Sequence, residues 1–357
     1  MTVAAAYSLD GRPVLFADMM LTAPKQPRQS GRLSPTQPYA ETVLGDIGLV
    51  SAGSTRKALI VNERLAVAWC GDFASAKRVI ARLRLIFGEE TANLESLQQE
   101  LSFLDEFSPE TSCRVVGWLV DDGPRCFRWD SRSPSRLETG PEFVEGSGAS
   151  LFLTMVNEPM TRGVSEEGTS LDRVQYALAA RIAASLRRDW RDSATTLNGF
   201  GYWYEAIFLD DGGRFRYVDN LVFSAWMVDF DTGGKVLLIA PPTIVVQARS
   251  NERFAVVQTT WIDNRGSATD TYVDVVGDGT DPLDDIDPRK QVIRAEPDQL
   301  CWAFIVAIGD RRGEVTLVTE RGGSFGRFIM DGKMRIEFRP QELFDLFQSA
   351  LDELPAA

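Results

Sequence analysis

β-Hairpin patterns recur along residues 2–240, and no other feature limits the fold of this chain as strongly. Each pattern consists of two apolar strands around a short turn, as at Asp10-Gly11, where the residue pair is a strong hairpin signal. The hairpins are expected at 2–18, 57–71, 113–130 and 201–219. Long amphipathic helical patterns separate them. Antiparallel hairpins with segregated helices are typical of layered proteins, so the sequence predicts an α+β fold.

The helical patterns carry their own start and stop signals. In the first, at 73–87, Asp72 is expected to cap the N-terminus and Gly88 follows the C-terminal end. A shorter helix is expected to cover about 91–104. A second long amphipathic helix is expected at 170–190 and begins with a serine cap.

Two stretches depart from this regular alternation. Residues 142–155 predict a strand that breaks at Gly-Ser-Gly, and 23–56 predicts a long surface loop because Pro, Gly, Ser and Thr dominate it. A short apolar piece, TVLGDIGLV, interrupts that loop. Further along, the composition becomes strand-rich. We therefore expect a first domain at 1–243 and a β-rich C-terminal extension at 244–357.

The extension is expected to consist mostly of strands and to end in a helix. The strands are expected at 253–263, 271–276, 290–295, 301–310, 314–320 and 333–338, and the helix at 340–354. The acidic stretch at 277–288 lacks the ligand spacing of a calcium-binding loop, so we expect a solvated loop there. The sequence assigns no role to the extension.

Net charge and histidine content exclude several classes of function. The net charge of −13 argues against broad binding to nucleic-acid phosphates. The chain has no histidine, which removes imidazole bases, Ser-His-Asp triads and histidine-ligated metal sites. A catalytic base would have to be a carboxylate, a lysine, a cysteine or a terminal amine.

The cysteines and apolar runs bear on the cellular compartment. The four cysteines are scattered without CxxC spacing, at Cys70, Cys113, Cys126 and Cys301. No apolar run reaches the roughly 18 residues of a membrane-spanning helix, and the N-terminus lacks the basic and apolar regions of a signal peptide. We expect a cytoplasmic protein with reduced thiols and no membrane contact.

Thr2 stands directly behind the initiator methionine, and its chemistry suits a nucleophile that carries its own base. A small residue in this position favours removal of Met1, which leaves a threonine with a free α-amine. The unperturbed pKa of such an amine is about 7.7–8.0, close to the ideal for a general base at neutral pH. Nucleophile and base then belong to one residue.

Three further residues suit the same chemistry. Asp18 ends the strand paired with the first one, Lys57 begins the next hairpin, and Gly71 lies at a strand-to-helix junction. An ammonium group favours an alkoxide, a carboxylate can orient that ammonium group, and a glycine N–H beside a helix N-terminus is a good oxyanion donor. Each residue also has a structural interpretation: a turn cap, a solvated edge residue and a helix-entry turn, respectively.

Taken in order, these residues resemble the proteasome β-subunits and HslV peptidases, which belong to the N-terminal nucleophile (Ntn) hydrolases. The match consists of the Thr2–Asp18 spacing, the Lys57–Gly71 spacing, Thr22 in DMMLT, and Gly146-Ser147-Gly148. The resemblance covers residues 2–240 and is clear only at these motifs.

The resemblance implies a four-layer αββα sandwich and a role for each matched residue. Thr2 would be the nucleophile and its α-amine the base, while Asp18 and Lys57 tune the hydroxyl and the Gly71 N–H binds the oxyanion. The remaining implied roles are support of the amine by Ser147, main-chain substrate binding by Thr22, and narrowing of the specificity pocket by Trp69.

The resemblance also implies a substrate class and partners. The substrate would be a peptide bond or a small-molecule amide, cleaved through an ester on Thr2 without a metal or an organic cofactor. The partners would be further copies of the chain, in a homo-oligomer, and an unfoldase.

The chain departs from the family in five places, two of which are the bulky Trp69 and the Cys70-Gly71-Asp72 turn in place of a more glycine-rich one. The insertion before Lys57 is long, the second supporting acid of the family has only Asp192 as a candidate, and the extension has no counterpart. These departures leave open a non-catalytic Ntn-fold scaffold or binding protein, and an unrelated α+β protein. Glu205, Asp210 and Asp211 could imitate a catalytic carboxylate pair, but DDGG favours a turn.

Overall fold

The protein combines helices with several antiparallel sheets, and the predicted α+β class is confirmed. The computed structural model describes residues 2–24, 40–104, 108, 111–157, 173–192, 194–197, 200–239, 242, 244–263, 265, 267–280, 283, 285–291, 293, 301–308, 314–319, 326–330 and 334–352. None of the helices in these ranges is both long and apolar enough to span a membrane.

The first sheet contains the N-terminal hairpin and has the strand order β10-β1-β2-β11-β12. Its strands are β1 (Ala4–Leu9), β2 (Arg12–Asp18), β10 (Phe143–Glu145), β11 (Tyr204–Leu209) and β12 (Phe215–Tyr217). The Asp10-Gly11 turn joins β1 to β2 in the predicted hairpin, with Ala4 opposite Ala17. The hairpin predicted at 201–219 is formed by β11 and β12.

The second sheet is built from the other two predicted hairpins and has the order β5-β6-β7-β8-β9. Its strands are β5 (Ala58–Asn62), β6 (Leu65–Gly71), β7 (Cys113–Val120), β8 (Pro124–Asp130) and β9 (Leu137–Gly140). Helix α2 (Phe73–Phe87) follows β6, with Asp72 as its N-cap as predicted, and α3 (Leu94–Ser102) follows α2.

Both faces of each of these two sheets are buried. Small side chains such as Ala4, Ala17, Ala66 and Ala68 form a cluster that joins the two sheets face to face. Helices α2 and α3 pack on the outer face of the second sheet, where Val79 and Leu97 join one cluster with Trp129. This double burial explains why β1 and β2 are apolar almost throughout instead of alternating.

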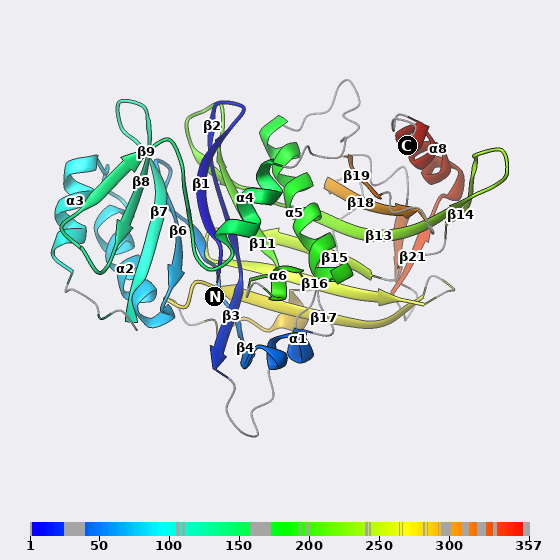
Figure 1. Ribbon diagram of the computed structural model, residues 1–357, viewed down its shortest axis with the longest axis horizontal. Coiled ribbons are helices and arrows are strands. Elements are labelled where there is room, and N and C mark those ends of the chain that lie inside the picture. Colours follow the sequence, from blue (N-terminus) through cyan, green and yellow to red (C-terminus); the bar gives the residue numbers. More distant parts are fainter. Residues whose placement is uncertain are drawn as a thin grey trace.

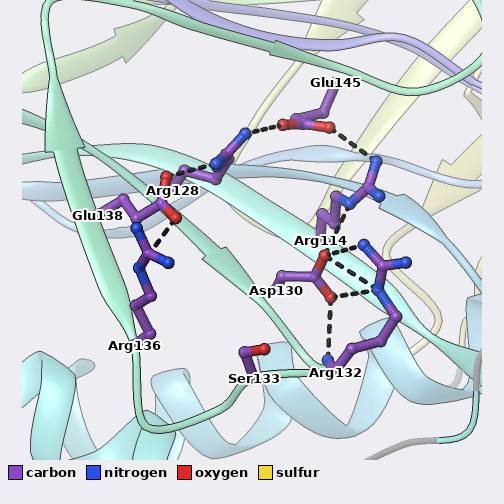
Figure 2. A pocket seen from close by; sticks show the side chains of 8 residues that line it. All are labelled: Arg114, Arg128, Asp130, Arg132, Ser133, Arg136, Glu138 and Glu145. Carbon is purple, nitrogen blue, oxygen red and sulfur yellow. Dashed lines mark hydrogen bonds and ion pairs between the residues drawn. The ribbon is translucent and has the colours of Figure 1, made fainter.

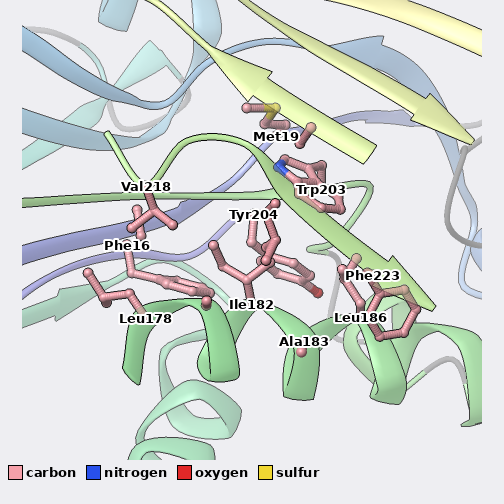
Figure 3. Packing of buried hydrophobic residues seen from close by; sticks show 14 of the residues in the cluster. Phe16, Met19, Leu178, Ile182, Ala183, Leu186, Trp203, Tyr204, Val218 and Phe223 are labelled. Carbon is pink, nitrogen blue, oxygen red and sulfur yellow. The ribbon is translucent and has the colours of Figure 1, made fainter. Parts of the chain in front are cut away.

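The outer face of the first sheet is covered by α4 (Ala149–Asn157) and α5 (Arg173–Asp192), as Figure 1 shows. In Figure 3, Phe16 and Tyr204 of this sheet face Leu178 and Ile182 of α5. The serine predicted to cap this helix lies outside the described residues. Residues 149–155 are expected to continue the strand beyond Gly-Ser-Gly, but they belong to α4 because their apolar side chains pack against this core.

The third sheet begins earlier than the predicted boundary at 244. Its order is β17-β16-β15-β13-β18-β19, with β14 also paired to β13. Its strands are β13 (Leu221–Phe230), β14 (Val236–Ile239), β15 (Ile244–Ser250), β16 (Phe254–Ile262), β17 (Ala268–Gly277), β18 (Cys301–Ile308) and β19 (Glu314–Thr319). Strand β13 pairs with both β15 and β18, so the boundary at 244 falls inside this sheet.

The third sheet also shares a hydrophobic core with the first. Val246, Ala255 and Val257 belong to the same buried cluster as Phe16 and Leu178. The strand-rich C-terminal part is therefore packed into the core that holds the N-terminal hairpin, because its inner face buries apolar side chains against the same helix and strands.

Two other expectations need correction. Within 23–56, the predicted loop, β3 (Met20–Pro24) pairs with β4 (Leu49–Ser54), and α1 (Ala40–Asp46) precedes β4. Of the strand expected at 290–295, Lys290 instead belongs to the short helix η2 (Pro288–Lys290), whose turn includes Gln291, while 292, 294 and 295 lie outside the described residues. Near the C-terminus, β20 (Gly326–Met330) pairs with β21 (Met334–Phe338), and α8 (Pro340–Asp352) forms the predicted closing helix.

We expect three buried thiols to make the fold sensitive to alkaline pH. Burial raises the pKa of Cys70, Cys113 and Cys126 to about 12, whereas unfolded thiols titrate near about 8.5. The unfolded state alone then loses protons, so stability is full below pH ~8.5 and falls as the pH rises toward 12.

Each of these thiols should cost about 1.4 kcal/mol per pH unit above pH ~9. Urea unfolding at pH 7.5, 8.5 and 9.5 measures this slope. The triple variant Cys70→Ala, Cys113→Ala, Cys126→Ala should have a flatter profile; a slope equal to the wild-type slope would show that other groups cause it.

Candidate active site

Asp18 lies at the centre of a buried cluster that joins three separate segments of the chain. It is the last residue of β2 and is fully buried. The Thr2 hydroxyl donates to its Oδ1 at 2.5 Å, and Lys57 Nζ lies 3.1 Å from Oδ1 and 3.0 Å from Oδ2. The nucleophile, acid and lysine predicted from the sequence are thus in direct hydrogen-bonding contact through Asp18.

Backbone N–H groups complete the coordination of this carboxylate. Val3 donates to Oδ1 at 2.9 Å, and Met20 and Gly201 donate to Oδ2 at 3.1 and 3.3 Å. Together, these hydrogen bonds fix the orientation of the carboxylate. Asp18 is therefore held in one fixed position between Thr2 and Lys57.

Lys57 is buried, and its ammonium group forms hydrogen bonds to oxygen atoms of the described residues. In addition to the Asp18 carboxylate, Nζ donates to the Met20 carbonyl oxygen at 2.5 Å. Burial lowers the pKa of Lys57, and the attraction of Asp18 only partly opposes this effect. A buried lysine with a shifted pKa beside a carboxylate and a hydroxyl is typical of functional sites.

Ser147 follows β10, the strand that pairs with β1 on the side away from β2. Thr2 N donates to Ser147 Oγ at 3.1 Å, and Gly148 N donates to the Thr2 carbonyl oxygen at 3.1 Å. Gly146 has a φ of +101°, and a Cβ there would lie 2.1 Å from the Thr2 carbonyl oxygen. The Gly-Ser-Gly loop can approach Thr2 this closely only because position 146 has no side chain.

A second buried ion pair, which the sequence did not predict, holds the residue next to Lys57. Arg56 is fully buried and its Nε and Nη2 contact Glu205, the shortest distance being 2.6 Å. Burial opposes the charge of Arg56, but the nearby Glu205 carboxylate outweighs this effect and raises the pKa. Arg56 Nη1 also donates to the Asn251 carbonyl oxygen at 2.5 Å.

The third sheet contributes directly to this arrangement. The N–H groups of Thr55 and Arg56 donate to Met19 O and Gly277 O, both at 2.9 Å, and the Thr55 hydroxyl donates to Gly277 O at 3.0 Å. Gly277 ends β17 and Asn251 follows β15. The extension thus fixes the backbone that carries Lys57. Carbonyl groups at the end of β17 and just after β15 accept hydrogen bonds from the residues before Lys57.

The three acids of the fourth hairpin do not form a carboxylate pair. Glu205 pairs with Arg56, Asp210 with Arg216, and Asp211 with Arg12. Gly213 N donates to Asp210 O at 3.0 Å, so DDGG forms the turn that the sequence favoured.

The other predicted residues, Gly71, Trp69 and Thr22, lie on β6 and β3. Gly71 ends β6 with a φ of +103°, and a Cβ there would lie 2.4 Å from Ser112 O. Thr22 lies on β3 opposite Ser51. Trp69 is buried with the α2 side chains, and its indole N–H donates to Arg56 O at 3.3 Å. The burial of Trp69 favours a core role, while oxyanion binding by Gly71 and substrate binding by Thr22 stay predictions.

Helix α5 carries a buried acid near the site, but this acid is Asp189 and not the predicted Asp192. The side chain of Asp192 lies outside the described residues. Asp189, one turn earlier, is fully buried and accepts a hydrogen bond from the Tyr204 hydroxyl at 3.0 Å. Tyr204 is the β11 residue opposite Asp18. Helical periodicity could have identified Asp189, because it shares the buried face of α5 with Ile182 and Leu186.

The described part of the chain shows no group of three or more metal-binding side chains.

Comparison with known proteins gives no independent assignment of the site. No protein-family model matches the chain, and no curated protein matches it at a significant level.

Proposed function

We propose that this chain is an N-terminal threonine hydrolase of the Ntn type that cleaves an amide bond. The observation that carries the proposal is the buried cluster in which Asp18 binds both the Thr2 hydroxyl and Lys57, while Ser147 accepts from Thr2 N. Residues far apart in the sequence supply these groups. Their hydrogen bonds join a nucleophile to the groups that can change its acidity.

The packing order supports the same proposal. The buried clusters connect four layers in order: helices α2 and α3, the second sheet, the first sheet, and helices α4 and α5. A four-layer αββα sandwich of this order is what the resemblance to Ntn hydrolases implies. Fold alone does not assign an activity, so the proposal depends on the cluster around Thr2.

In the proposed reaction, removal of Met1 converts Thr2 N into a free amine. Thr2 Oγ1 attacks the amide carbonyl carbon, and its proton passes to the amine, directly or through one water. The tetrahedral intermediate collapses to an ester on Thr2, and the leaving amine takes that proton. Water then attacks the ester, releasing the acid and restoring the hydroxyl. Asp18 and Lys57 hold the hydroxyl in a fixed electrostatic field throughout.

A peptide bond is the proposed substrate, with a small-molecule amide as the second choice. Self-association, an unfoldase partner and a cytoplasmic location are proposals that rest on the resemblance and on the sequence.

A non-catalytic scaffold with the same fold is the alternative, and one observation favours it. Thr2 is only 4% exposed, and Asp18 and Lys57 are buried, so the cluster has the burial of a structural core. A buried hydrogen-bonded acid and lysine can also serve to specify a unique fold.

The intact mass of the protein, with and without a peptide epoxyketone, distinguishes the two. This reagent requires both the hydroxyl and the free amine of an N-terminal threonine. An active enzyme should lack Met1 and gain one probe mapped to Thr2, and Thr2→Ala should abolish both labelling and amide hydrolysis. Thr154→Ala is the matched control, since Thr154 is an exposed residue of α4 whose hydroxyl donates to Ser150 O.

Retention of Met1 together with absence of labelling would favour the scaffold. Hydrolysis that persists in Thr2→Ala with an unchanged pH profile would exclude Thr2 as the nucleophile.

A further inference from the structure

A charged pocket lies at one end of the interface between the first and second sheets. Its volume is about 240 Å³, and Figure 2 shows the side chains that line it: Arg114, Arg128, Asp130, Arg132, Ser133, Arg136, Glu138 and Glu145. All of these residues except Glu145 come from β7, β8, β9 and the turn between β8 and β9. Glu145 ends β10 of the opposite sheet.

The charged residues form one alternating chain of ion pairs, called here the arginine ladder. In order, it runs Arg132, Asp130, Arg114, Glu145, Arg128, Glu138 and Arg136. Its distances are 2.5 Å for Arg132–Asp130, 3.0 Å for Arg114–Asp130, 2.9 Å for each Glu145 pair, and 3.1 Å for Arg136–Glu138. Each carboxylate therefore bridges two arginines (Figure 2).

An arginine lies at each end of the ladder, so the arginines outnumber the acids by one. This excess of positive charge is the feature that points to a ligand. The four arginines and three acids give the pocket a formal charge of +1, in a protein whose net charge is −13. The terminal side chains of Arg132 and Arg136 are 45% and 73% exposed, and each pairs with one acid. A guanidinium group has five N–H donors, so both ends retain donor capacity toward the pocket.

The inner ion pairs of the ladder have a structural role. Arg114 and Arg128 tie Glu145 of the first sheet to the second sheet, so these pairs close the end of the inter-sheet layer. Arg132 and Arg136 lie on either side of Ser133 in the turn after β8, and their ion pairs with Asp130 and Glu138 stay within the second sheet (Figure 2). Joining the sheets therefore does not require them.

We propose that this pocket binds a small molecule carrying two oxyanion groups, held between Arg132 and Arg136 with the Ser133 hydroxyl beside them. Arginine matches the geometry of phosphate and carboxylate oxygens through paired N–H donors. A pocket of about 240 Å³ admits a small diphosphate or dicarboxylate rather than a polymer. Binding here does not depend on the reaction proposed for Thr2.

Calorimetric titration with inorganic pyrophosphate, at constant ionic strength, tests this site. We expect saturable binding to the wild-type protein and binding weakened at least about tenfold in Arg132→Gln and in Arg136→Gln, since each loses a charged hydrogen-bonding partner. Arg253→Gln is the matched control: its side chain is 46% exposed and pairs with the exposed Asp285. It should bind as the wild type does.

Absence of saturable heat with pyrophosphate would overturn the proposal. Equal weakening in all three variants would also overturn it, because the effect would then follow net charge rather than the pocket. Urea unfolding of each variant without ligand verifies the fold, and the exposure of both terminal arginines predicts little loss of stability.

Discussion

Replacing Lys57 by methionine should lower the free energy of unfolding by about 3–5 kcal/mol and abolish labelling of Thr2. The reason is that Asp18 stays fully buried after it loses the ammonium group that contacts both of its carboxylate oxygens. An unpaired buried carboxylate must either remain charged at high cost or take up a proton. Urea unfolding measures the first effect, and intact mass with the epoxyketone measures the second.

The matched control is Lys77→Met, since Lys77 is an exposed residue of α2. Its effect on stability should lie within about 0.5 kcal/mol. A double-mutant cycle with Asp18→Asn adds a sharper test, because two groups in contact should not contribute independently. If the two single effects simply add, the Asp18–Lys57 contact does not organise the site.

Replacing Arg56 by methionine should also cost about 3–5 kcal/mol, although Arg56 takes no part in the proposed reaction. Its guanidinium group is fully buried against Glu205, donates to Asn251 O, and lies 4.3 Å from the centre of the Tyr217 ring. Removing it leaves Glu205 buried, and the Ser250 hydroxyl, which donates to Glu205 Oε1 at 3.1 Å, does not replace the lost positive charge. Urea unfolding of the full chain measures this change.

Arg12→Met is the control for this prediction, since Arg12 pairs on the surface with Asp211, which is 86% exposed. That pair should contribute no more than about 1 kcal/mol. Arg56→Lys should recover only part of the stability, because lysine keeps the charge but not the two-pronged contact with Glu205. Full recovery would mean that charge alone matters at this position.

Together, these two ion pairs explain why the strand-rich C-terminal part cannot be regarded as a simple appendage. Lys57 supports Asp18, and the residues immediately before it are held by Glu205, Asn251 and Gly277. The first of these three lies in the first sheet, and the other two lie at the ends of third-sheet strands. Hydrogen bonds from the first and the third sheet thus fix the short segment before Lys57.

The hairpins were predictable because their signals are local. A two-residue Asp-Gly turn fixes the register of the strands it joins, and this register places Asp18 next to Val3, whose carbonyl oxygen accepts from Asp18 N at 3.4 Å. The return of Asp18 to the N-terminus therefore follows from the turn and from strand length. The start of α2 at its Asp72 cap is local in the same sense.

Regular structure within 23–56 and the helix after Gly-Ser-Gly were not predicted. Polar turn residues dominate the first segment, so its short strands are stable only because β3 and β4 pair with each other. The apolar run after Gly148 has no periodicity that separates a buried helix from a buried strand, and packing on the first sheet decides in favour of α4.

The sequence by itself determined the α+β class, the four hairpins, the Asp72-capped helix, and the approach of Asp18 to the residues around Thr2, because each depends on contacts between residues close along the chain. Only the tertiary structure decided that Ser147 meets Thr2, that Lys57 meets Asp18, and that Arg56 meets Glu205. These contacts join different hairpins and sheets. They depend on how the buried faces pack, and no local propensity encodes that packing.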